Sequence, residues 1–222
     1  MSKRKPLIIL GADSYAEIAN YYFTNDSIYE VIGFSLDNDY ISEDSFIDLP
    51  IISTEDILKK YVTSKYEIFI AIGYSKLNKN RRDKFNFFKK QGYKLASYIS
   101  SNATILSKEP IEDNCFILEN NTIQPFVKIG KNVVLWSGNH IGHHSIIHNH
   151  TFIASQVVIS GSVEIGEETF IGVNSTISDH VKIGDRCLLG AGALITKDTL
   201  NDTVYIPEST KCSKIPSYKL FK

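Results

Sequence analysis

The stretch that decides the fold runs from Ile105 to Ile195, written here in groups of six: ILSKEP IEDNCF ILENNT IQPFVK IGKNVV LWSGNH IGHHSI IHNHTF IASQVV ISGSVE IGEETF IGVNST ISDHVK IGDRCL LGAGAL I. Each group opens on isoleucine or leucine, without an insertion or deletion. A period of six matches neither the 3.6-residue period of an α-helix nor the two-residue alternation of an ordinary strand. It is the repeat of a hexapeptide parallel β-helix.

Three hexapeptides make one triangular coil of about eighteen residues, and successive coils stack about 4.8 Å apart, as paired parallel strands do. We expect the opening aliphatic of each group to point into the prism, where the stacked side chains form one continuous core. The residue two positions before it is small or valine in most groups, which suits a narrow interior corner. Glycine often follows the aliphatic, where it relieves crowding or permits an unusual backbone shape.

Residues 1–100 show a different pattern, in which apolar runs alternate with helical stretches. Strands are predicted at 7–10, 29–36, 67–72 and 95–99, and helices at 15–22, from 54 onward and at 76–91. This alternation predicts a small parallel sheet, an α/β Rossmann-like domain. The predicted division is therefore 1–100 for this domain, 101–198 for the β-helix and 199–222 for a C-terminal tail, with a loop leaving the prism after Ile195.

Composition argues against several classes of protein. The chain of 222 residues has 24 basic and 25 acidic side chains and a net charge of −1. It lacks a basic run, so we expect no nucleic-acid partner. The first apolar run ends after four residues at Gly11, too short for a signal peptide or a membrane span. We therefore expect a cytoplasmic protein without membrane contact.

The three cysteines do not suggest a disulfide. Cys115 and Cys187 occupy the small interior position of their repeats, four coils and about 19 Å apart. That separation is beyond the reach of a disulfide. We expect both to fill the core, and Cys212 in the tail to be a free thiol.

The loops after the N-terminal strands are the expected ligand edge of the sheet. The candidate substrate-binding residues in these loops are Gly11, Asp13, Ser14, Asp37, Gly73 and Lys76. Arg81 is a further candidate cation for a pyrophosphate. The first loop lacks the G-x-G-x-x-G pattern, so we expect no redox dinucleotide, although amides at a helix start suit a phosphate.

Five of the six histidines lie between residues 140 and 150. The register places His143 at a corner outside the prism, with Gly161 above it in the next coil. A base that takes a proton from a nucleophile, beside a backbone N–H that binds an oxyanion, suits acyl transfer. We therefore predict His143 and Gly161 as catalytic, with His140 as an accessory. His148 and His150 are expected to be solvated.

A zinc site is the competing interpretation of these histidines. Hexapeptide prisms also include the γ-class carbonic anhydrases, which bind zinc with three histidines at a subunit interface. His144 and His180 are thirty-six residues apart, as two ligands of that pattern are. The third position is Asp185 instead of histidine, so the match is incomplete, although zinc accepts a carboxylate. We predict no metal.

With these residues placed, the chain resembles the left-handed β-helix acyltransferases of the sialic acid O-acetyltransferase type. That family includes N-acetyltransferases of nucleotide-linked amino sugars. The resemblance covers nearly the whole chain and is most specific at 139–145, 172–175 and 190–193. It implies a homotrimer with acetyl-coenzyme A lying along the prism between neighbouring subunits, and a nucleotide sugar held by the N-terminal domain.

The resemblance also implies roles for single residues. His143 matches the family's general base, and Gly161 matches the glycine whose N–H meets the thioester carbonyl. Val173 and Ala191 match positions that line the pantetheine arm, so with Gly161 they are the candidate cofactor-binding residues.

Three positions depart from the family. The residue after the base is usually acidic and is His144 here, so the group that orients His143 is unassigned. A second family histidine, nine residues after the base, is Phe152. The N-terminal loop usually has consecutive glycine and histidine, and here reads Asp13-Ser14-Tyr15.

The predicted function is a coenzyme A-dependent N-acetyltransferase for the amino group of a nucleotide-linked amino-deoxysugar used in surface glycans. An O-acetyltransferase of the same fold, a non-catalytic scaffold and the zinc hydratase remain as alternatives. The nucleotide, the sugar and the carbon that bears the nitrogen stay open. Outward apolar residues at Val134, Ile146 and Val158 need cover, which also favours the homotrimer.

Overall fold

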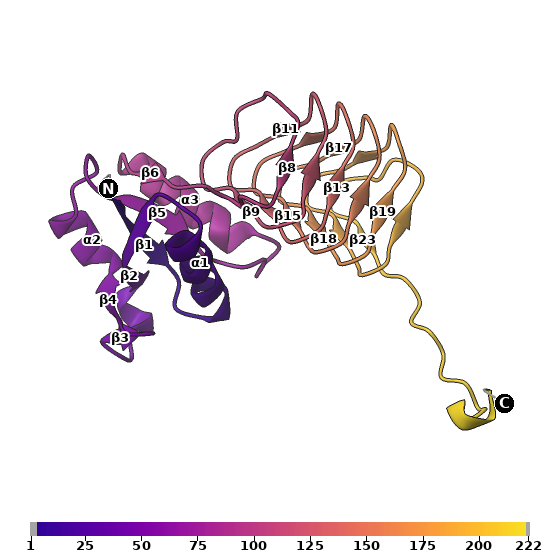
Figure 1. Ribbon diagram of the computed structural model, residues 1–222, viewed down its shortest axis with the longest axis horizontal. Helices are drawn as coiled ribbons and strands as arrows, with labels where there is room; N and C mark the ends of the chain where they lie inside the picture. Colours follow the sequence, from indigo (N-terminus) through magenta and orange to yellow (C-terminus); the bar gives the residue numbers. More distant parts are fainter. Residues whose placement is uncertain (1–3, 221–222) are drawn as a thin grey trace.

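The computed structural model describes residues 4–220, which form a layered sheet-and-helix domain joined to a triangular prism (Figure 1). The N-terminal sheet has the strand order β3-β4-β2-β1-β5-β6 and is parallel except for β3. This confirms the predicted Rossmann-like domain. Its strands are β1 (Lys5–Leu10), β2 (Tyr29–Leu36), β3 (Ser45–Phe46), β4 (Leu49–Ser53), β5 (Glu67–Ile70) and β6 (Lys94–Leu95).

The first two α-helices each begin at a capping side chain. In α1 (Ser14–Asn25) the Asp13 carboxylate accepts hydrogen bonds from the Tyr15 and Ala16 amides, at 3.0 and 3.1 Å. In α2 (Thr54–Lys60) Ser53 caps in the same way. Short 3₁₀ helices occur at η1 (Asn38–Tyr40) and η2 (Ser217–Lys219). Among residues 4–220, no helix has the length and apolar character needed to cross a bilayer.

The third helix, α3 (Lys79–Lys90), starts three residues later than predicted. Lys76, Leu77 and Asn78 all adopt left-handed backbone conformations, which end any helix before them. The buried Asn78 amide donates to the Glu168 and Thr169 carbonyls of the prism, at 3.0 and 3.2 Å. The contact between Asn78 and the prism therefore places the start of α3 later than the sequence pattern predicts.

The prism has three flat faces built from two-residue strands. Face 1 contains β8 (Thr104–Ile105), β10 (Thr122–Ile123), β13 (His140–Ile141), β16 (Val158–Ile159), β19 (Thr176–Ile177) and β22 (Leu194–Ile195). Face 2 contains β11 (Lys128–Ile129), β14 (Ile146–Ile147), β17 (Glu164–Ile165) and β20 (Lys182–Ile183). Face 3 contains β7 (Tyr98–Ile99), β9 (Phe116–Ile117), β12 (Val134–Leu135), β15 (Phe152–Ile153), β18 (Phe170–Ile171), β21 (Leu188–Leu189) and β23 (Val204–Tyr205).

Parallel pairing between coils joins residues eighteen apart, as in Ile141 with Ile159. From Ile117 to Ile195 the opening aliphatic of each group is at most 5% exposed, and together these side chains form one core. The left-handed parallel β-helix predicted from the repeat is confirmed. A Cβ on Gly142 would lie 2.4 Å from the Ser160 carbonyl carbon, so this glycine relieves crowding between coils.

The corners repeat a feature that the hydrophobic pattern did not predict. The residue before the small interior residue has a left-handed backbone, with φ between 53° and 68° where it is not glycine. Asparagine tolerates that conformation well and is frequent there. The non-glycine members of the series are Asn114, Asn120, Phe126, Asn132, His144, His150, Gln156, Ser162, Glu168, Asn174, His180 and Arg186.

The last coil is shorter than the others. Val204 in β23 pairs with Leu188, sixteen residues earlier instead of eighteen. The loop after Ile195 was predicted to leave the prism, but it closes this coil. Among the described residues, face 2 has no strand in this coil, and side chains of the loop form hydrogen bonds in its place. Asp198 accepts a hydrogen bond from the Lys182 amide at 2.8 Å. Beyond β23 the tail runs away from the prism, and Cys212 on it is exposed and free, as predicted (Figure 1).

The two domains share one apolar cluster. Outward side chains of face 3, including Phe116 and Val134, pack with residues of α1 and the N-terminal sheet. The Phe116 ring lies 5.2 Å from Phe69 and 5.7 Å from Tyr15. Val134 is 1% exposed, because the chain's own N-terminal domain covers it. The prediction that Val134 needs another subunit to cover it was therefore wrong. Val158 on face 1 stays 43% exposed.

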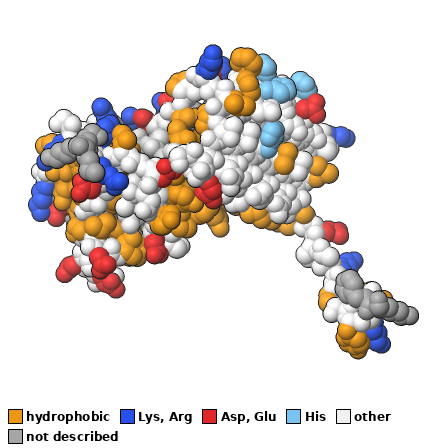
Figure 2. Space-filling model, viewed as in Figure 1, with side chains coloured by type: hydrophobic (Ala, Val, Ile, Leu, Met, Phe, Trp, Pro, Cys, Tyr) orange, Lys and Arg blue, Asp and Glu red, His pale blue; other side chains and the backbone are white. Residues whose placement is uncertain are grey.

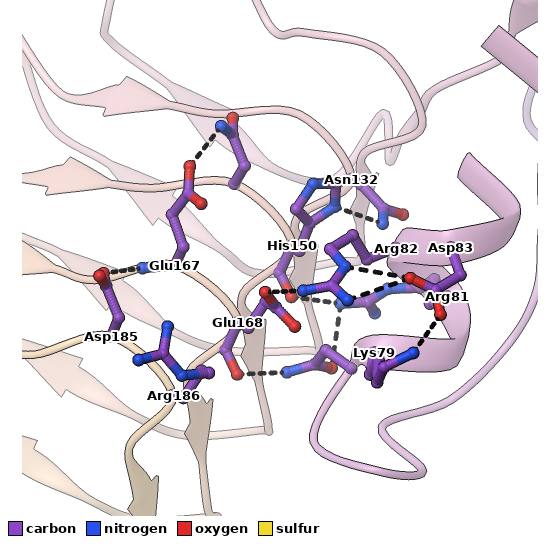
Figure 3. Close-up of polar contacts among 12 residues, drawn as sticks. Lys79, Arg81, Arg82, Asp83, Asn132, His150, Glu167, Glu168, Asp185 and Arg186 are labelled. Atoms are coloured by element: carbon purple, nitrogen blue, oxygen red, sulfur yellow. Dashed lines mark hydrogen bonds and ion pairs between the residues drawn. The ribbon is translucent and has the colours of Figure 1, made fainter. Parts of the chain in front are cut away.

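A polar column at the corner between faces 2 and 3 completes the domain junction (Figure 3). Asn114 accepts from the Ile70 amide and donates to Asn132, both at 2.8 Å. The Asn132 amide donates to His150 Nδ1, also at 2.8 Å. One coil above His150, Glu168 pairs with Arg82 of α3. Residues eighteen apart thus form a continuous docking edge for the N-terminal domain.

Two predictions failed at this junction because the domains dock there. Arg81 is fully buried and donates to the His150 carbonyl at 2.8 Å, so it does not face the strand-end loops. His150 is 9% exposed and packs against Phe85, so it is not solvated. Burial, helped by the charges of Arg81 and Arg82, lowers the pKa of His150 to about 4.

The lowered pKa of His150 makes the stability of the fold pH-dependent. The folded value lies below the ordinary 6.5, so the unfolded chain binds the extra proton first. Neutral His150 contributes fully to the free energy of unfolding above pH 6.5. This contribution falls as the pH drops toward 4, by about 3 kcal/mol in all. Denaturant unfolding should show this loss in the wild type and not in His150→Asn. His180→Asn is the control, because His180 is exposed and has the same left-handed backbone as His150. Identical pH slopes for all three proteins would contradict the account.

Candidate active site

The corner between faces 1 and 2 brings His143 and Gly161 together. His143 follows β13, and Gly161 follows β16 one coil above. A Cβ built on Gly161 would lie 2.6 Å from His143 Cε1 and 2.8 Å from Nε2, so the imidazole packs directly on the glycine. The His143 amide donates to Gln124 Oε1 at 2.9 Å, and its carbonyl accepts from the Ser162 amide at 2.8 Å. The ring itself is exposed.

Gly161 leaves a hydrogen-bond donor free beside this imidazole. Within residues 4–220 its N–H has no acceptor, whereas its carbonyl accepts from the His180 amide at 3.0 Å. A free backbone N–H next to an exposed base can bind a developing oxyanion while the base takes a proton. The two groups that the register predicted to lie together, the His143 imidazole and the Gly161 N–H, are therefore at one solvent-facing corner.

His144 is the partner of His143 that sequence reasoning left unassigned. The two Nδ1 atoms lie 3.1 Å apart. The His144 ring also lies 4.7 Å from the ring of Phe126, one coil below. The exposed Phe126, at the same corner position eighteen residues before His144, was the sequence signal for this arrangement.

The remaining histidines of the cluster have other surroundings. His140 points outward from the flat surface of face 1, half-buried between Thr122 and Val158. His148 contacts Glu164 at 3.0 Å, and this hydrogen bond, with Lys182 nearby, holds the pKa of Glu164 below its usual range. Histidine side chains gather on the exposed surface of the prism (Figure 2).

Within one chain, the residues of the zinc interpretation lie at two different corners. His144 and His180 share a corner, but Asp185 lies at the junction corner, where it accepts from the Glu167 amide at 2.8 Å (Figure 3). In the part of the chain that the structure describes, no group of three or more His, Cys, Asp or Glu side chains could hold a metal ion.

Val173 and Ala191 lie at a different corner, between faces 3 and 1. They border a cavity of about 410 Å³, which we call the aromatic hollow; its other main lining residues are Tyr74, Trp136, Phe152 and Phe170. Face 1 separates them from His143 and Gly161. The predicted cofactor-binding residues are therefore divided between two corners of one chain.

The aromatic hollow was missed because it joins both domains. Tyr74, from the loop after β5, lies 5.1 Å from Phe152 and 4.6 Å from Phe170. A signal was present in the prism sequence: the residues just before the interior aliphatic on face 3 are all apolar. No local pattern predicts that Tyr74 folds onto them.

A second cavity of about 410 Å³ lies at the carboxyl ends of β1, β2 and β5. Of the predicted substrate-binding residues, Gly11, Asp37 and Lys76 line it. Asp13, Ser14 and Gly73 are not part of its lining, and Asp13 instead caps α1. We call this cavity the strand-end cleft.

The charges of the strand-end cleft are partly paired. Lys84 contacts both carboxylate oxygens of Asp37, at 2.5 and 2.6 Å, and Thr54 donates to one of them at 2.8 Å. Partial burial opposes ionisation, but these hydrogen bonds lower the pKa of Asp37. Within residues 4–220 the buried Ser35 hydroxyl, which also lines the cleft, has no partner. An incoming polar ligand would find that hydroxyl available.

Comparison with known proteins agrees with this architecture. Residues 111–143 and 162–197 match the family model described as bacterial transferase hexapeptide (six repeats). A search of curated proteins by sequence finds no match. The chain has the fold of the left-handed β-helix acetyltransferases.

Three solved structures illustrate the likeness. The acetyltransferase domain of PglB from Neisseria gonorrhoeae aligns with a TM-score of 0.81 and 22% identity, covering 90% of this chain and 96% of that one. PerB from Caulobacter crescentus, in complex with coenzyme A and GDP-perosamine, gives 0.80 and 18%, covering 90% and 92%. WeeI from Acinetobacter baumannii gives 0.75 and 20%, covering 90% and 95%. At these identities the likeness establishes the fold.

Gly161→Ala should disturb the corner without unfolding the prism. The added methyl would sit 2.6 Å from His143 Cε1, so the imidazole must move. We expect a changed His143 Cε1–H signal in NMR spectra and an unchanged far-UV circular dichroism spectrum. Gly73→Ala is the matched control, because a Cβ there meets nothing within 4 Å. An unmoved His143 signal in Gly161→Ala would show that the ring does not rest on this glycine in solution.

Proposed function

We propose that the chain is an acetyl-coenzyme A-dependent N-acetyltransferase that acts on the amino group of a nucleotide-linked amino-deoxysugar. The observation that carries this proposal is the exposed His143 imidazole packed on Gly161, whose N–H is free. Attack of an amine on a thioester needs a proton acceptor and a stabilised oxyanion, and this corner offers both.

In the proposed reaction the substrate amine attacks the thioester carbonyl carbon, and His143 Nε2 removes a proton from the nitrogen. The carbonyl oxygen gains negative charge and accepts a hydrogen bond from the Gly161 N–H. Collapse of the tetrahedral intermediate breaks the C–S bond and leaves the amide as product. The proton on His143 Nε2 passes to the departing sulfur, so coenzyme A leaves as the thiol and the base is regenerated. An imidazole titrates near neutral pH and can serve as this base in the cell.

The proposed assembly is a homotrimer with shared sites. Val173 and Ala191 are candidate contacts for the pantetheine arm, but they lie at a different corner from His143 and Gly161. A threefold arrangement of prisms would bring the corner of one chain that carries His143 against the corner of its neighbour that carries Val173 and Ala191. The exposed Val158 on face 1, between these corners, supports an interface there.

The strand-end cleft is the proposed site for the nucleotide. It lies where parallel α/β sheets bind ligands, at the carboxyl ends of the strands. Lys76 offers a charge for a pyrophosphate, and Asp37 and Ser35 offer hydrogen-bonding groups for a ribose or base. The similar PerB structure contains GDP-perosamine together with coenzyme A, which supports a nucleotide sugar as the acceptor here.

The direct test is turnover of acetyl-coenzyme A with a panel of UDP-, dTDP- and GDP-linked amino sugars, measured by thiol release and product mass. We expect one class of acceptor to be acetylated on nitrogen. His143→Ala should lower kcat by about 10²- to 10⁴-fold with little change in coenzyme A affinity. His148→Ala, outside the corner, should keep the wild-type kcat. Thiol release without an acetylated amine, or a His143→Ala protein as active as the wild type, would contradict the proposal.

A further inference from the structure

The corner that carries His143 holds a second imidazole, for which the proposed reaction has no role. The Nδ1 atoms of His143 and His144 lie 3.1 Å apart, with the ring planes at 85°. A contact of this length between two imidazole nitrogens is a hydrogen bond when one ring donates and the other accepts. The 3.1 Å contact therefore suits a pair with a single proton between the two Nδ1 atoms.

His144 is held in place by groups other than His143. Its backbone is left-handed, with φ of 59°, and its amide donates to the Pro125 carbonyl at 3.2 Å. Its ring packs on Phe126, tilted by 34°. Phe126 is itself left-handed and 62% exposed, an unusual combination for a large apolar residue. The Phe126 ring supports the His144 ring from below and keeps His144 Nδ1 directed toward His143.

The proton's location decides whether His143 can act as a base. If His143 carries the Nδ1 proton, its Nε2 has a free lone pair beside Gly161. When Nε2 then takes a proton from the substrate amine, His143 still donates through Nδ1 and His144 still accepts. Neither ring has to turn or change tautomer during the reaction. If His144 carried the proton, His143 Nε2 would be protonated already and could not be the base.

We propose that His144 is the positioning residue for His143: it accepts the His143 Nδ1 proton and so selects the tautomer with a basic Nε2. This inference rests on the proposed function, because it takes His143 as the base. An acceptor on the second ring nitrogen is the general means of fixing an imidazole for proton transfer. Here that acceptor is a second neutral imidazole.

A neutral imidazole supports a protonated His143 less strongly than a carboxylate would. It lacks the negative charge with which a carboxylate would stabilise the imidazolium. A proton on His144 Nδ1 would also place two donors face to face and break the hydrogen bond between the rings. Within the described residues the groups packed on the pair carry no charge: Gln124, Phe126, Gly161 and Ser162. Asp179 and His180, two coils above, pair with each other at 3.9 Å.

Three substitutions separate positioning from a merely structural role. His144→Ala removes the acceptor and should lower kcat about ten- to a hundredfold, with little change in KM for acetyl-coenzyme A. His144→Gln retains a neutral acceptor and should restore most of kcat, with the rising limb of the pH profile in place. His144→Glu should move that limb to higher pH by about one unit, because the carboxylate stabilises protonated His143. His180→Ala, at the same corner position two coils above, should match the wild type.

Nitrogen NMR of ¹⁵N-histidine-labelled protein provides a readout independent of turnover. In the wild type at pH 8 we expect His143 protonated at Nδ1 and His144 unprotonated there, and in His144→Ala a mixture of both His143 tautomers. The proposal is overturned if His144→Ala keeps the wild-type kcat and pH profile, or if neutral His143 carries its proton on Nε2. If the wild type acetylates no acceptor, the proposed function fails, and these spectra alone decide whether the rings share the proton.

Discussion

Parallel pairing between residues eighteen apart is the constraint on which the rest of the structure depends. Each backbone pair, such as His140 with Val158, holds one coil in register with the next. A shift of one residue would move the buried aliphatic residues to the surface, so the core tolerates no slip. As a result, side chains far apart in the sequence stand in straight columns along the prism.

Each of the three corner columns of the prism has a different role. The column through Asn132, His150 and Glu168 docks the N-terminal domain by hydrogen bonds and an ion pair. The column through His143 and Gly161 faces solvent and holds the groups proposed to be catalytic. The third borders the aromatic hollow. The fold supplies the columns, and the residues that occupy each column determine what that edge can do.

Features set by the repeat could be predicted from the sequence, because an uninterrupted period leaves one register. Counting in steps of eighteen along that register is enough to place His143 against Gly161. Features set by domain docking could not be predicted this way. The burial of Arg81 and His150, and the late start of α3, depend on contacts between the sheet domain and the prism. At the N-terminal loop, a local rule was available: an aspartate just before a helix is a capping residue, and Asp13 is one.

The central claim is that one active site is assembled from two chains, and mixed trimers test it most directly. His143→Ala disables one corner, and Ala191→Trp should block the other, so each protein alone should keep at most about 1% of the wild-type turnover. Refolded together in equal amounts, they should recover about a quarter of the wild-type turnover, because a quarter of the interfaces in random threefold trimers combine two intact corners. Mixed trimers that form normally and show no turnover would contradict the account, since the two corners would then have to act within a single chain.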